Sequence, residues 1–158
     1  MPRIEEKIEI AAARVDVFRF CHDLSSWPEW FEQVVHVELL TPAPVRSGTL
    51  LRIDGDTGGA VFTWDAEYIG YQMPHGSTLR VLDAASSCPF GVGSELNWQL
   101  ESVGNATQFS WTWQYKPHGF WAGITDKLGG RARTQRAIQR SLATLKELVE
   151  SGRRARIR

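Results

Sequence analysis

Five stretches of the chain alternate between apolar and polar residues, which is the pattern of a β-strand with one buried and one solvated face. They span 3–10, 34–40, 60–71, 94–101 and 107–116. Two further strands, 48–54 and 78–84, are predicted between residues that favour turns. Most successive strands are separated by short loops, which favours antiparallel pairing of neighbours. The pattern predicts one antiparallel sheet whose apolar face needs a cover.

Two short helices are predicted between the first and second strands. The apolar spacing of Val15, Phe18 and Cys21 indicates a helix over 14–23. Pro28 suits the first turn of a second helix over 28–33, with Ser26 as its N-cap residue.

A long C-terminal helix is predicted from about 120 to 151, because eight positions at spacings of four and three share one face. These positions are Ile124, Leu128, Arg131, Gln135, Ile138, Leu142, Leu145 and Val149. The half from Ile138 to Val149 is apolar at each inward step and is expected to clamp the sheet. The half before it contains Gly129, Gly130 and the two polar residues, and is the expected place for a ligand.

The predicted fold is therefore α+β: a curved antiparallel sheet of about seven strands, wrapped on a long C-terminal helix, with two short helices after the first strand. Composition does not change abruptly along the chain and no repeat is present. We predict a single domain over 1–152, followed by a basic tail at 153–158.

Charge and cysteine content narrow the classes of function. Net charge is zero, so nothing global points to nucleic acid. From residue 131 onward, nine Lys and Arg stand against two Asp and Glu, which we interpret as a solvated helix face and a basic tail. Two cysteines are too few for a disulfide scaffold. Neither a signal peptide nor a membrane span is recognisable, and we predict a cytoplasmic protein without an integral membrane segment.

Several local motifs support a resemblance to a known family. They are Val-Asp-Val-Phe at 15–18, Asp23-Leu24 with Trp27-Pro28-Glu29-Trp30, Gly48, Glu67-Tyr68 before Pro74, the strands of Trp98 and Trp111/Trp113, and the helix end from Leu142 to Glu150. Over residues 3–151 the chain resembles the helix-grip fold of the START-like superfamily, and in particular SRPBCC proteins of the polyketide cyclase/dehydrase type. The resemblance implies a cavity between the curved sheet and the long helix. Similar members include aromatase/cyclases, carriers of lipids and hormones, and coenzyme Q-binding proteins.

Large aromatic residues on the apolar faces of the strands are the first candidates for a binding site. So many rings on a concave face favour a partly open pocket, which would be mostly apolar; the alternative is that they fill a core. With apolar residues of the helix, the predicted lining is Phe62, Trp64, Tyr68, Trp98, Phe109, Trp111, Trp113, Tyr115, Trp121, Ile124 and Leu128, together with Arg131 and Gln135.

Arg131, Gln135 and Tyr115 are the candidates for catalysis. A buried guanidinium needs a partner. Asp65, Asp83 or a ligand oxygen could supply one, and Arg131 could then stabilise an enolate. The alternative is that the helix is rotated by one residue and Arg131 is solvated.

Other motifs give weaker indications of function. His118 lies near the expected rim of the cavity, where a general base is conceivable, although a solvated loop histidine is the more ordinary interpretation. Cys21 and His22 are adjacent in a predicted helix, so we expect their side chains to diverge by about 100° and not to form a pair. No metal or cofactor is predicted, since metal-ligand spacings, a Gly-x-Ser-x-Gly elbow and a dinucleotide or phosphate loop are missing from the sequence.

Three hypotheses follow for the function. The favoured one is a protein that binds a small hydrophobic or aromatic molecule between the sheet and the helix. The second is an enzyme of the cyclase, aromatase or dehydratase type that acts on a poly-keto substrate. The third is a protein-interaction module with a filled core. The sequence does not identify the ligand, and it is compatible with an oligomer.

Overall fold

A computed structural model describes residues 2–56, 58, 61–85, 88, 90–116 and 129–157, without the side chains of 153–157. It confirms the predicted fold class. The strands are β1 (Arg3–Ile10), β2 (Val34–Leu39), β3 (Leu50–Asp56), β4 (Val61–Gln72), β5 (Gly76–Ala84), β6 (Glu95–Val103) and β7 (Ala106–Gln114). The helices are α1 (Arg14–Cys21), the 3-10 turn η1 (Leu24–Ser26), α2 (Trp27–Trp30) and α4 (Arg131–Ile157).

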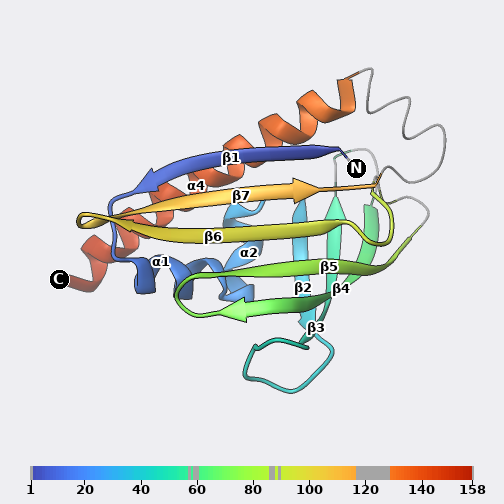
Figure 1. The fold of residues 1–158 in the computed structure, drawn as a ribbon, viewed down its shortest axis with the longest axis horizontal. Helices are drawn as coiled ribbons and strands as arrows, with labels where there is room; N and C mark the ends of the chain where they lie inside the picture. Colours follow the sequence, from blue (N-terminus) through green and yellow to red (C-terminus); the bar gives the residue numbers. More distant parts are fainter. Residues whose placement is uncertain are drawn as a thin grey trace.

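The seven strands form one antiparallel sheet in the order β1-β7-β6-β5-β4-β3-β2. From β2 to β7, each strand pairs with the next one in the sequence. Strand β1 does not pair with β2 but with the last strand, β7. The pairing of β4 with β5 contains register shifts. The sheet is strongly curled here, because such bulges bend the strands. Figure 1 shows the outcome: β2 and β3 run across the direction of β1, β7 and β6.

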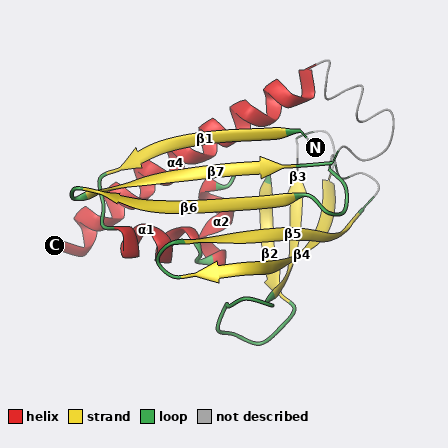
Figure 2. Cartoon of the chain, in the orientation of Figure 1, coloured by secondary structure: helices red, strands yellow, loops and turns green. Residues whose placement is uncertain are grey.

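The long helix lies behind the sheet and extends past it (Figures 1 and 2). It packs chiefly against β1, and also against α2 and α1. Ile138, Leu142, Leu145 and Val149 are all buried, at most 6% exposed. This confirms the predicted apolar seam in the C-terminal half of the helix.

The C-terminal end of this helix differs from the prediction. Its described part begins at Arg131, after a π-helical turn at Gly129 and Gly130. Gly129 has a φ of 138°, which favours glycine because a Cβ is strained there. The predicted start near residue 120 lies outside the described residues. At the other end the backbone stays helical to Ile157, so the predicted basic tail continues α4.

The second short helix is also shorter than predicted. It ends at Trp30, and Gln33 adopts a left-handed φ of 76° where the chain turns into β2. Ser26 occupies the N-cap position, but its hydroxyl does not cap the helix. It donates to main-chain carbonyls of Phe20 and Asp23 and accepts a hydrogen bond from Trp30 Nε1 at 3.1 Å. Its side chain therefore anchors α2 to the preceding turns.

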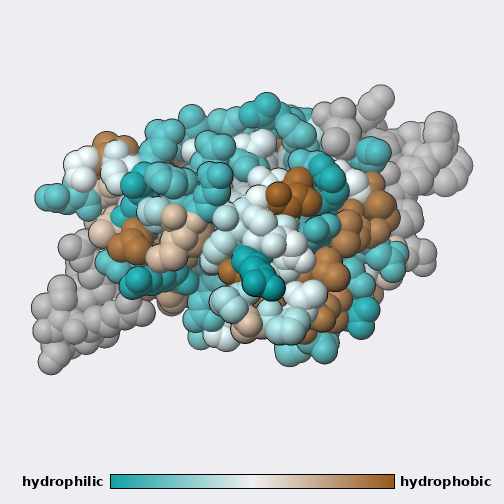
Figure 3. Space-filling model, turned by 60° about the horizontal axis from the view of Figure 1, so that its bottom comes forward, coloured by the Kyte–Doolittle hydropathy of each residue, from teal (hydrophilic) through white to brown (hydrophobic). Residues whose placement is uncertain are grey.

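Apolar residues also occur on the outside. Ile69, Met73 and Leu82 are exposed, and Figure 3 shows brown groups mixed with polar residues on the face that carries β4 and β5. Exposed apolar residues of this kind are normal on the surface of a folded protein. The main concentration of apolar surface is inside, between the sheet and its helices.

Candidate functional site

The inward face of the sheet holds most of the predicted ligand-lining residues. Each is at most 8% exposed. They are Phe62, Trp64, Tyr68, Trp98, Phe109, Trp111, Trp113 and Tyr115. Trp121, Ile124 and Leu128, and also His118, lie outside the described residues.

One group of rings, the α2 aromatic cluster, consists of Trp27, Trp30, Phe31, Trp98 and Trp111. Ring centroids lie 5.4 Å apart for Trp30 and Trp98, 5.4 Å for Trp98 and Trp111, and 5.0 Å for Phe31 and Trp111. These are ordinary packing distances for aromatic pairs. The short helix α2 therefore packs its own rings against the middle of β6 and β7.

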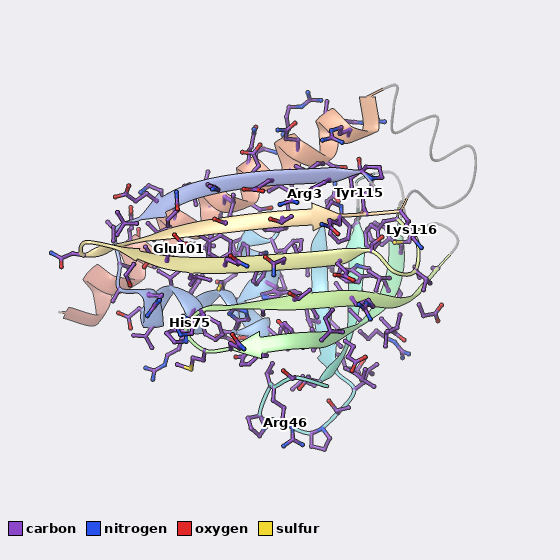
Figure 4. All side chains as sticks on the ribbon, viewed as in Figure 1. Arg3, Arg46, His75, Glu101, Tyr115 and Lys116 are labelled. Atoms are coloured by element: carbon purple, nitrogen blue, oxygen red, sulfur yellow. The ribbon has the colours of Figure 1, made fainter. Side chains whose placement is uncertain are left out.

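A second group, the β7-end aromatic cluster, consists of Phe62, Trp64, Phe90, Trp113 and Tyr115. The ring of Phe90 stands edge-on to Trp64 and Trp113, with centroids at 5.2 and 5.1 Å. The rings of Trp113 and Tyr115 are stacked at 6.0 Å. Figure 4 shows Tyr115 where β7 ends, beside the start of β1. The cluster thus lies at the end of the sheet that leads to residues 117–128.

Among the residues that the structure describes, three buried polar atoms on the inward face have no hydrogen-bond partner: Tyr68 Oη, Trp98 Nε1 and Trp111 Nε1. The paired indoles of α2 are a contrast, since Trp27 Nε1 donates to Cys21 O at 2.9 Å and Trp30 Nε1 donates to Ser26 Oγ. An unpaired buried donor costs about 1–3 kcal/mol. All three atoms carry a proton to donate. The two indole nitrogens are N–H donors, and burial raises the pKa of the Tyr68 phenol and keeps it neutral.

His22 lies at the other end of the interior, where α1 meets the hairpin of β4 and β5. It is 5% exposed, with Nδ1 at 2.9 Å from Phe18 O and Nε2 at 2.6 Å from Ser77 Oγ. Burial lowers its pKa from the ordinary 6.5 to about 4, and the hydrogen bond with Phe18 opposes this only in part. The imidazole is therefore neutral at physiological pH.

The expectation that Cys21 and His22 diverge is wrong. Cys21 Sγ lies 3.2 Å from His22 Nδ1. Helix α1 ends at Cys21, and His22 is its C-cap residue with φ −100° and ψ 0°, so the regular 100° step does not apply between them. Burial raises the pKa of the Cys21 thiol well above its usual range, which keeps this pair neutral.

Arg131 and Gln135 are attached to the edge strand β1. Arg131 is exposed and donates to the main-chain oxygen of Arg3. Gln135 Nε2 and Gln139 Nε2 donate to Glu6 Oε1 at 2.7 and 3.0 Å. The structure thus places the Arg131 guanidinium in solvent, with Arg3 as its partner instead of Asp65 or Asp83. The solvated alternative holds, but not through a rotated helix, because Ile138 to Val149 keep the predicted face buried.

Further along, the same helix continues this row of contacts. Lys146 Nζ donates to Glu9 O at 2.8 Å, and Glu150 Oε1 accepts from Ala11 N at 2.9 Å. A sheet edge with unpaired main-chain groups invites aggregation unless it is covered. The polar residues on this side of α4 cover the edge of β1, and the apolar seam faces the interior.

Replacing Arg131 with Ala is expected to change ligand affinity by less than about twofold, since the guanidinium lies outside the aromatic interior. Unfolding free energy should fall by less than about 1 kcal/mol, the usual net contribution of one hydrogen bond. Urea unfolding and a ligand titration measure the two quantities. If the variant loses ligand binding at unchanged stability, Arg131 belongs to the binding site after all.

Sequence reasoning overlooked Ser77 and undervalued Glu6 and His22. The alternation along β1 puts Glu6 on the same face as its isoleucines. A polar residue on that face was a signal in the sequence for its contact with α4. No pattern marked Ser77, because its partner His22 is 55 residues away in the chain.

Outside the interior, a groove of about 400 Å³ lies on the outer face of β1, β5, β6 and β7. Its lining is polar or charged throughout, including Arg3, Glu5, Asn97 and Gln99. This does not suit an apolar ligand. Among the described residues, three or more His, Cys, Asp or Glu side chains nowhere gather as metal ligands, and none of the described helices has the length and apolarity to cross a membrane.

Comparison with known proteins agrees with this architecture. The sequence model of the family described as "polyketide cyclase / dehydrase and lipid transport" matches residues 1–150. The chain belongs to this family. A search of curated proteins gave no match.

Solved structures of similar fold come from several organisms. A protein from Thermus thermophilus is 18% identical, with a TM-score of 0.79 over 96% of this chain and 99% of the other. The Zhui aromatase/cyclase from a Streptomyces species is 18% identical, with a TM-score of 0.77 over 94% and 93%. Major latex-like protein 151 from Panax ginseng is 10% identical, with a TM-score of 0.67 over 96% of each chain. At these identities the similarity shows a shared fold.

Proposed function

We propose that the protein binds a small hydrophobic or aromatic molecule between the sheet and α4, and that this molecule carries carbonyl-type oxygens. The observation that carries the proposal is the set of unpartnered buried donors at Tyr68, Trp98 and Trp111. All three lie on the aromatic inward face, where an apolar ligand would be held. An indole N–H can only donate, so a ligand atom that faces Trp98 or Trp111 must accept, and ketones and quinones fit better than hydrocarbons.

The second candidate is a cyclase, aromatase or dehydratase that acts on a poly-keto substrate. The same donors favour it, because a neutral phenol or indole N–H facing a substrate oxygen can stabilise a developing enolate. The fold shared with an aromatase/cyclase is a further argument by analogy. Arg131 and Gln135, held at the edge of β1, do not support it. The free thiols of Cys21 and Cys88 fit the prediction of a cytoplasmic protein.

The binding proposal can be tested with a matched pair of probes, 2-acetylnaphthalene and 2-ethylnaphthalene. They share the aromatic part and differ mainly in the carbonyl oxygen. Isothermal titration calorimetry should show that the ketone binds about 5- to 30-fold more tightly, which corresponds to about 1–2 kcal/mol for satisfying buried donors. Equal affinities for the two probes would show that the buried donors do not contribute to ligand binding. Binding of neither probe, nor of larger aromatic ketones, would favour the interaction module with a filled core.

A further inference from the structure

The pair formed by Ser77 and His22 has the geometry of an activated hydroxyl. The carbonyl of Phe18 can only accept, so His22 Nδ1 carries the proton and donates it at 2.9 Å. His22 Nε2 is then bare and must accept, so the Ser77 hydroxyl donates to it at 2.6 Å. A nucleophile within hydrogen-bond reach of a base, with the base oriented by a third group, is the arrangement that activates serine in acyl transfer.

The fold fixes this pair from three elements. His22 caps α1, and its ring stacks on Phe18 with centroids 3.9 Å apart. Ser77 faces Trp98 directly across β5 and β6. Gly76 allows this close approach, because a Cβ there would lie 2.3 Å from the main-chain oxygen of Trp98. Packing on α1, β5 and β6 therefore positions the hydroxyl next to the imidazole.

Two of the unpartnered donors belong to rings that border His22. The centroid of the Trp98 ring lies 5.4 Å from that of His22, and the centroid of the Tyr68 ring lies 6.2 Å away. Unpartnered donors on rings that border the histidine of such a pair are candidates for stabilising an oxyanion. Ser77 and His22 are 7% and 5% exposed, so an acyl group would reach them as part of a hydrophobic molecule.

We propose that Ser77 is a nucleophile for acyl transfer, with His22 as its base and Tyr68 and Trp98 as oxyanion donors, acting on an ester or thioester of a hydrophobic acid. This rests on the proposed function, because the same interior must admit the substrate. Ser77 Oγ forms a bond to the carbonyl carbon while the bond from that carbon to the leaving oxygen or sulfur breaks. The serine proton passes through His22 Nε2 to the leaving group. Water then hydrolyses the acyl-serine to the free acid.

The experiment uses 2-naphthyl acetate with the whole protein at pH 6. A burst of about one naphthol per protein is expected, together with an acetyl group on Ser77 located by peptide mass spectrometry. Ser77→Ala and His22→Gln should each reduce the burst at least about 100-fold. Ser94→Ala is the matched control, since Ser94 is a buried hydroxyl that donates to Gly91 O instead of a histidine. It should keep the burst.

Circular dichroism and titration with 2-acetylnaphthalene establish that each variant is folded and still binds. If His22→Gln does not fold, the wild-type pH profile serves instead: the acetylation rate should stay level from pH 7 to 5, whereas a base with the ordinary histidine pKa would lose most of its activity by pH 5. Three results would overturn the proposal: an acetyl group only on other residues, a burst that survives Ser77→Ala, or no burst from protein that binds 2-acetylnaphthalene. The last would leave the proposed binding function standing.

Discussion

Lowering the pH from 7 to 4 is expected to remove about 3 kcal/mol of stability through His22 alone. Burial lowers the folded-state pKa of His22 to about 4, against 6.5 in the unfolded chain. Between these values the unfolded chain binds a proton that the folded protein does not, so stability falls as the pH falls, by about 1.4 kcal/mol per pH unit. The contribution is complete above pH 6.5 and is lost at pH 4.

Urea unfolding at a series of pH values measures this effect. Carboxylates also titrate in the range, so the comparison with His22→Gln isolates the histidine: the variant should lose about 3 kcal/mol less between pH 7 and 4. Tyr68, Tyr71 and Cys21 surround His22, and burial raises the pKa of each of them, so they stay neutral throughout. His36→Gln, which replaces an exposed histidine and leaves His22 in place, is the matched control for the substitution itself. Parallel curves for wild type and His22→Gln would show that His22 remains solvated.

Replacing Tyr68 with Phe should change stability and binding in opposite directions. The ligand-free protein is expected to gain about 1–2 kcal/mol, because the variant no longer buries an unpaired hydroxyl. For a chain of this size, that raises the midpoint of thermal unfolding by about 2–8 °C. Affinity for 2-acetylnaphthalene should fall about 5- to 30-fold, while affinity for 2-ethylnaphthalene should stay the same.

Differential scanning calorimetry and the paired titrations check both halves. Tyr71→Phe is the matched control on the same strand, since Tyr71 is half-buried and its hydroxyl is not among the unpartnered buried atoms. It should produce neither effect. A loss of stability in Tyr68→Phe would mean that the phenol has a partner in the folded protein. A gain of stability with unchanged ketone affinity would place the ligand away from Tyr68.

The interior combines two kinds of aromatic residue. Trp27 and Trp30 of α2 have satisfied N–H groups and fix a short helix that would be marginal alone. Trp98 and Trp111 of the sheet are equally buried, but their N–H groups have no partner among the described residues. Natural interiors seldom leave buried donors unpaired, and the exceptions concentrate where a ligand or a reaction supplies the missing partner. This distinction separates packing residues from candidate binding residues within a single aromatic core.

Much of the fold could be predicted from the sequence because it is encoded locally. Alternation placed the aromatic residues of β7 on a buried face, and the spacing of Ile138, Leu142, Leu145 and Val149 identified the buried face of α4. The strand ends and the length of α2 were predicted less well, since turns such as that at Gln33 depend on contacts with the rest of the fold.

The candidate site was predictable only in part. Periodicity shows which face of an element is buried, but not what its residues meet there. It gave Arg131 and Gln135 a place on the inward stripe, whereas the path of α4 along β1 brought them to the sheet edge.

The sequence by itself determined the seven strands, the apolar seam of α4 and the aromatic inward face, because each follows from neighbours a few residues apart. Only the tertiary structure decided which polar atoms are paired. Ser77 meets His22 across 55 residues and Gln135 meets Glu6 across 129. Within the described part of the chain, Tyr68 Oη, Trp98 Nε1 and Trp111 Nε1 have no hydrogen-bond partner. The physical reason is that a hydrogen bond depends on distances of about 3 Å between atoms, which distant segments reach only when the sheet has curled and α4 has docked.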